Sequence, residues 1–155
     1  MLLAALALRI RGAGQGPAAI AVFALGTVGI ALGAASDALF GTLGRIALTG
    51  DPRTVKALYQ VDGFLTARSL WFAAGVLVLT AWAAWSAFPR WYPVLGIAGA
   101  VLLALGGVSL KTTGFFSPLG GMTFVAFLGL LVWTLATCWI VWRGPQEDVP
   151  AAVTT

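Results

Sequence analysis

Four long stretches of the sequence, at about residues 17–36, 64–88, 94–110 and 119–142, carry a single charged side chain between them, Arg68. An α-helix rises about 1.5 Å per residue, so about 20 residues cover the roughly 30 Å hydrocarbon core of a bilayer. Within hydrocarbon every backbone polar group needs an internal partner, and a continuous helix supplies one. These stretches therefore predict helices that cross a membrane.

The overall composition indicates the same environment. Hydrophobic residues make up 60% of the chain and charged residues 9%. A soluble domain is about 45–50% apolar and about 25% charged, and a disordered chain is poorer still in apolar residues. We therefore expect an all-α integral membrane protein, folded as an antiparallel four-helix bundle because short connections join the successive spans.

The helical pattern continues beyond the end of the first stretch. Leu39, Leu43 and Ile46 keep a helical spacing. The segment Gly50-Asp51-Pro52 then combines a residue suited to end a helix with an N-cap and a first helical position. We interpret residues 37–62 as a helical hairpin tip, whose two arms extend the first two spans to the membrane surface or beyond it.

The two ends of the chain are assigned separately from the four-helix domain, residues 17–143. Residues 1–16 are predicted as a short stub and loop. Within them Met1–Leu8 is apolar but too short to cross a bilayer, and two arginines follow it, which is the reverse of a secretory signal. It is either an interfacial stub or the end of a helix that begins outside the chain. Residues 144–155 form a polar tail that we expect to lack fixed structure.

The ionisable residues limit the chemistry that the chain can carry. It has no His and one Cys, Cys138, so it lacks the commonest general base and any pair of thiols for a disulfide or metal site. We assign no catalytic residue, cofactor or metal ligand, and we expect the protein not to be an enzyme. A nucleophilic pair of Ser109 and Lys111 is disfavoured, because Lys111 falls at a helix end.

One group of polar residues is predicted to meet at a membrane boundary. If residues 17–88 fold back at Gly50, Asp37 lies level with Asp62, and Arg68 lies about 7 Å deeper. A long side chain can extend that far toward the surface. The candidate cluster comprises Asp37, Tyr59, Asp62, Arg68 and Lys111. It is either a set of ion pairs that holds the two arms of the hairpin together, a polar pocket for a lipid headgroup or small polar ligand, or a set of unpaired interfacial charges.

Glycines recur at helical spacing in two of the stretches. Small residues at such spacing let helix backbones approach closely in lipid. We expect this close packing within the chain rather than between chains. The predicted packing positions are Gly26, Gly29, Gly33, Gly96 and Gly99.

The net charge of +4 comes from Lys and Arg near the ends of the stretches, and no basic run of the kind that binds nucleic acid is present. We expect membrane lipids as partners, with another membrane protein or a second copy as alternatives. One side carries Arg9, Arg11, Arg90 and Arg143; the other carries Arg45, Arg53, Lys56, Arg68 and Lys111. This near-balance does not decide orientation. Two arginines directly before the first full span favour cytoplasmic termini.

Two segments in the last half of the chain carry a resemblance. The segment from Phe88 to Gly99 (FPRWYPVLGIAG) resembles the turn and helix of uncharacterised polytopic membrane protein families of high-GC bacteria. The segment from Leu128 to Trp133 (LGLLVW), with Trp142 and Arg143 at the end of the same predicted helix, is similar to their last helix. The resemblance assigns no activity. It implies a bacterial protein, which we expect in the inner membrane. The excess of Arg over Lys, seven against two, also favours a bacterial origin.

The sequence as a whole predicts a structural, accessory or regulatory membrane subunit. The alternative is a small carrier or lipid-binding protein that uses the candidate cluster as a polar rim. A cavity that opens beside Arg68 would favour the alternative, whereas a face suited to a partner would favour the subunit.

Overall fold

The computed structural model describes residues 1–47, 50–85, 88–108, 114–115 and 120–143, and these residues form helices and turns without a strand. The helices are α1 (Leu2–Gly12), α2 (Gly16–Ile46), α3 (Pro52–Ala84), α4 (Trp91–Gly107) and α5 (Gly121–Trp142). Ser109, Lys111 and the polar tail lie outside the described residues.

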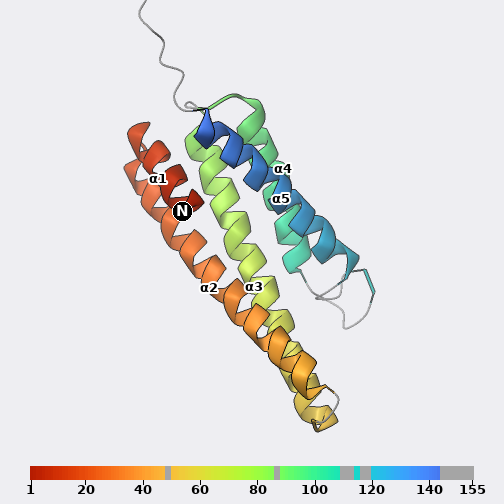
Figure 1. Cartoon of the computed structure of the whole chain (residues 1–155). Coiled ribbons are helices and arrows are strands. Elements are labelled where there is room, and N and C mark those ends of the chain that lie inside the picture. The colour runs from red at the N-terminus through yellow and green to blue at the C-terminus, as the bar shows by residue number, and fades with distance from the viewer. Residues whose placement is uncertain (48–49, 86–87, 109–113, 116–119, 144–155) are drawn as a thin grey trace, which may run out of the picture.

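The helices α2 and α3 form a long antiparallel hairpin (Figure 1). With 31 and 33 residues they are about 46 Å and about 50 Å long. The turn lies where the sequence placed it, because Asp51 accepts a hydrogen bond from the backbone N–H of Thr54 at 3.1 Å and so caps α3. On each side of the hairpin, the apolar stretch and the tip form one continuous helix.

The other two predicted spans, α4 and α5, are shorter and pack beside the upper part of the hairpin (Figure 1). The central helix is α3, which contacts both α2 and α4, and α5 packs on α4. The tip of the α2–α3 hairpin extends beyond the ends of α4 and α5. The predicted all-helical bundle with a protruding hairpin tip is therefore confirmed.

The N-terminal segment, predicted as a stub and loop, is the helix α1. Leu6 and Ile10 are four residues apart, share a face and are buried, because α1 folds back along α2 and also reaches α3 and α5. Gly14 makes this turn possible with a φ of 82°, in the left-handed region that favours glycine. One turn after Leu6, Arg9 donates a hydrogen bond to the backbone carbonyl of Ile140 and so ties α1 to α5.

Three helices, α2, α3 and α5, are long and apolar enough to cross a membrane. The apolar helix α4 has 17 residues, which corresponds to about 25 Å and is shorter than the hydrocarbon core of about 30 Å. By the length and composition of its helices, the chain is a multi-pass membrane protein. The predicted fourth crossing, by α4, is not shown by these criteria.

Four of the five predicted glycines lie at helix contacts. A methyl group added to Gly29 would lie 3.2 Å from the Cβ of Phe72 on α3, and one added to Gly96 would lie 3.2 Å from the Cβ of Ala81. Gly26 faces Leu3 of α1, and Gly99 faces Leu77 of α3. Gly33 is different: a methyl group there would meet nothing within 4 Å. The close packing predicted at Gly33 is therefore not present among the described residues.

Candidate functional site

Three polar side chains are buried together between α2 and α3. Asp62 is 1% exposed, Ser36 6% and Thr66 8%. The Ser36 hydroxyl donates a hydrogen bond to Oδ1 of Asp62, and its oxygen lies 2.7 Å from the hydroxyl oxygen of Thr66. Because Ser36 has one hydrogen to donate, Thr66 is the donor in the second bond. The result is a directed chain of hydrogen bonds from Thr66 through Ser36 to Asp62, which we call the polar pin.

If the end of α3 at Ala84 marks one membrane boundary, the length of the helix places the polar pin near the opposite boundary rather than at mid-depth. Asp62 precedes Ala84, at the other end of α3, by 22 residues, or about 33 Å along the helix. That distance matches the hydrocarbon thickness of about 30 Å. Gly107, at the end of α4, lies against Trp71 and Ala67 of α3, so Asp62 lies beyond the end of α4. A buried carboxylate is least costly at such a depth, where it can hold the two helices together by hydrogen bonds.

The structure does not bring the predicted ion-paired cluster together. Asp37 is exposed, because successive helical residues are about 100° apart and Ser36 is the residue that faces α3. Arg68 is also exposed, and its guanidinium lies 4.8 Å from the centre of the Phe64 ring. In the described part of the chain, no carboxylate forms an ion pair with Arg68. Of the predicted cluster only Asp62 is buried at the pin, and Lys111 is outside the described residues.

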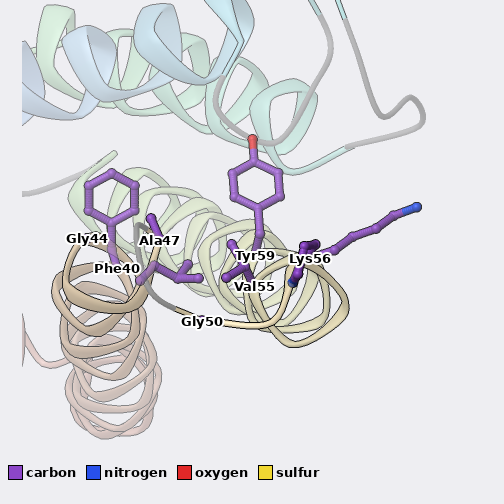
Figure 2. Close-up of a pocket in the computed structure, with 9 residues that line it drawn as sticks. Phe40, Gly44, Ala47, Gly50, Val55, Lys56 and Tyr59 are labelled. Carbon is purple, nitrogen blue, oxygen red and sulfur yellow. The ribbon is translucent and has the colours of Figure 1, made fainter.

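Tyr59, the remaining member of the predicted cluster, lies in the hairpin tip and is 38% exposed. It borders an apolar groove of about 670 Å³ between the ends of α2 and α3, which we call the tip groove. Figure 2 shows the rings of Phe40 and Tyr59 projecting from the two helices to the same side, while the side chain of Lys56 extends outward. The groove is lined by Phe40, Leu43, Gly44, Ala47, Gly50, Pro52, Val55, Lys56 and Tyr59.

The charges around the tip groove are mostly positive. Arg45, Arg53 and Lys56 are exposed on the two arms. Asp51 is the acidic residue of the turn, and its carboxylate already accepts hydrogen bonds from Thr54. The tip therefore presents an apolar groove bordered by Lys56, with Arg45 and Arg53 exposed outside the groove lining.

A second buried polar contact lies near the opposite end of the bundle and joins α4 to α5. The Tyr92 hydroxyl lies 2.9 Å from that of Thr137, which in turn donates to the backbone carbonyl of Trp133 at 2.8 Å. Tyr92 also stacks on Trp133, with ring centres 6.2 Å apart. The sequence analysis missed this contact, since no spacing links two residues that lie 45 positions apart.

The described residues contain no group of three or more His, Cys, Asp or Glu side chains that would hold a metal ion. Asp62 accepts a hydrogen bond from the Ser36 hydroxyl, and Cys138 is exposed on α5. The arrangement of the polar pin is suited to joining two helices rather than to general acid–base work, because the pin offers no second titratable group.

Comparison with protein-family models, with curated proteins and with solved structures gives no match in any of the three. The function is therefore inferred from the geometry of the chain itself.

Proposed function

We propose that this chain is a non-enzymatic accessory subunit of a bacterial inner-membrane assembly, and that a partner protein binds at the tip groove. One observation carries the proposal: the α2–α3 hairpin continues past the shorter helices α4 and α5 and ends in an apolar groove. The alternative of a carrier with a polar rim at Asp37, Asp62 and Arg68 has less support, because Asp37 and Arg68 are exposed and unpaired with Asp62.

The depth of the tip groove favours a protein as its occupant. Val55 precedes Asp62 by seven residues, so it lies about 10 Å beyond the boundary marked by the polar pin. The headgroup layer adds only about 5–8 Å on each side of the hydrocarbon core. The outer part of the groove therefore faces water. Apolar surface of this kind, rimmed by polar residues, is typical of protein interaction sites.

The shape and charge of the groove select an amphipathic helix with acidic side chains. The groove follows two helices whose lining residues recur at helical spacing, as at Phe40, Leu43 and Ala47. A third helix can place its apolar face in such a groove. An acidic residue beside that face would pair with Lys56, the cation that borders the groove. A second copy of the chain is disfavoured, because it would bring the same positive charges together.

Photo-cross-linking in native membranes tests this docking. A photoreactive residue replaces Gly44, which lines the groove and has open space around it. We expect an adduct with one acidic membrane protein, identified by mass spectrometry. The same residue at Ala38, which is exposed outside the groove lining, is the matched control and is expected to give no such adduct.

Charge reversal provides the decisive comparison for the same proposal. Lys56→Glu is expected to reduce the Gly44 adduct by about tenfold or more, since like charges at an interface are strongly unfavourable. Adducts that contain only lipid, only a second copy, or equal amounts of protein from Gly44 and Ala38 would contradict the proposal.

We further propose that the termini are cytoplasmic and the hairpin tip is on the outer side of the inner membrane. The support is Arg9 and Arg11, directly before α2. In a Cys138→Ser background, Thr54→Cys, which is exposed in the first turn of α3 and outside the groove lining, should react with a membrane-impermeant maleimide on intact spheroplasts. Ala13→Cys, in the exposed turn after α1, should react only after permeabilisation. The opposite pattern would reverse the orientation.

A further inference from the structure

Four arginines gather at the end of the bundle opposite the hairpin tip. The end of α1, the start of α4 and the end of α5 all lie at this end (Figure 1). Arg9 and Arg11 are in the last turn of α1, Arg90 is the N-cap residue of α4, and Arg143 is the C-cap residue of α5. Arg9 is partly buried and the other three are exposed. We call these four residues the arginine cluster.

Arg9 is the member that holds the parts of the arginine cluster together. Its guanidinium donates a hydrogen bond to the backbone carbonyl of Ile140, three residues before Arg143 on α5. The same guanidinium lies 5.2 Å from the centre of the Phe88 ring, two residues before Arg90. Arg90 and Arg143 therefore belong to segments that both contact one side chain. Because like charges gathered in this way repel one another, a nearby anion lowers the electrostatic free energy of this end.

In the part of the chain that the structure describes, no acidic side chain offsets the arginine cluster. The carboxylates there, Asp37, Asp51 and Asp62, all lie in the half of the α2–α3 hairpin toward the tip. The sequence has two further carboxylates, Glu147 and Asp148 in the tail, and these can neutralise at most two of the four arginines. A net positive charge of at least two therefore remains at this end for an external anion.

Exposed tryptophans place the arginine cluster at the level of the lipid headgroups. Indole rings concentrate at the boundary between hydrocarbon and water, because they have an apolar body and one polar N–H group. The exposed tryptophans near this end are Trp82, Trp85, Trp91, Trp139 and Trp142. The guanidinium of Arg143 lies 4.3 Å from the centre of the Trp139 ring. The phosphate groups of phospholipids lie in this same layer, beside the arginines.

We propose that the arginine cluster binds the headgroup of an anionic phospholipid from the leaflet opposite the hairpin tip. The exposed guanidinium groups of Arg11, Arg90 and Arg143 supply planar sets of N–H donors that match phosphate oxygens. Basic residues next to the ends of membrane helices are typical of sites for anionic lipids. Charge selects the occupant, since phosphatidylglycerol and cardiolipin are anionic and phosphatidylethanolamine is net neutral. A soluble acidic protein is disfavoured, because the tryptophans hold this surface within the headgroup layer.

Native mass spectrometry of the full chain tests the site by counting bound lipids. After extraction from membranes in mild detergent, the wild type is expected to retain phosphatidylglycerol or cardiolipin in excess of their share of the membrane. The double variant Arg90→Gln, Arg143→Gln should retain less anionic lipid by about tenfold or more, since each cation at a membrane surface adds to the attraction. Arg90→Lys, Arg143→Lys keeps the charge and should retain most of the lipid.

A double variant of the hairpin tip, Arg45→Gln, Arg53→Gln, is the matched control. It removes the same charge from two exposed residues, each nine positions beyond the polar pin residue on its own helix. It should retain anionic lipid as the wild type does.

Tryptophan fluorescence provides a second readout, in vesicles of phosphatidylethanolamine and phosphatidylglycerol. Phosphatidylglycerol with brominated chains should quench the wild type more than the same fraction of brominated phosphatidylethanolamine does. This difference should disappear in Arg90→Gln, Arg143→Gln and persist in the tip control.

Four outcomes would overturn the assignment. The wild type would retain lipids in the proportions of the membrane, or the glutamine variant of the arginine cluster would retain as much anionic lipid as the wild type. The tip control or the lysine variant would lose as much as that glutamine variant. None of these outcomes bears on partner binding at the tip groove, so the two proposals fail independently.

Discussion

Ser36→Ala is expected to lower the free energy of unfolding of the chain by about 3 kcal/mol. Asp62 is 1% exposed and receives its hydrogen bond from the Ser36 hydroxyl. Removal of that hydroxyl leaves a buried carboxylate without its donor and leaves the Thr66 hydroxyl without its acceptor. A buried charge without a partner costs far more than the hydrogen bond itself contributes. Thermal or chaotrope-induced unfolding in detergent micelles measures the loss.

Two exposed neighbours and one compound variant serve as controls for the polar pin. Asp37→Ala and Arg68→Ala are each expected to cost less than about 1 kcal/mol, because an exposed cation over an aromatic ring contributes about 0.5–1 kcal/mol. The triple variant Ser36→Ala, Asp62→Leu, Thr66→Val should recover most of the stability, since all three polar partners leave together. A larger loss of unfolding free energy from Arg68→Ala than from Ser36→Ala would contradict the polar pin and favour the ion pairs that the sequence predicted.

The sequence predicted which level of the α2–α3 hairpin Asp62 occupies relative to α2, but not the rotation of the helices at that level. Fold-back at Gly50 gave the right level for Asp62, because the rise per residue along a helix is constant. It did not distinguish Asp37 from Ser36, which differ by one residue and about 100° on the helix. One available signal was missed: Asp62 and Thr66 are four residues apart and share a face of an otherwise apolar helix.

Local signals were sufficient for the hairpin turn and the helical class, and insufficient for packing. The cap at Asp51 and the proline after it act within one helical turn, so the sequence alone located them. The position of α1 depends on contacts with α2, α3 and α5, which no local pattern encodes. Apolar side chains that face lipid also look the same in the sequence as those that face a neighbouring helix, so the tip groove was not foreseen.

Glycines show most directly that local sequence does not predict packing. The second prediction with a large expected effect is a substitution at one of them. Gly106→Leu is expected to destabilise the chain by about 3 kcal/mol. A methyl group at Gly106 would lie 2.6 Å from the Cβ of Ala126 on α5 and 3.5 Å from the carbonyl oxygen of Met122. Neither atom belongs to the flexible end of a side chain, so α4 and α5 would have to separate.

Gly33→Leu isolates this packing cost, because a leucine gains up to about 1 kcal/mol of helix propensity over glycine at either position. This gain in helix propensity cancels when the two variants are compared. The remaining difference is that Gly33 has open space around it, whereas Gly106 lies against α5. Unfolding in detergent should therefore show Gly33→Leu as stable as the wild type or slightly more stable, and Gly106→Leu less stable than Gly33→Leu by at least about 3 kcal/mol. Equal stabilities would mean that α4 and α5 are not in contact at Ala126, and the packing of the shorter helix pair would need to be revised.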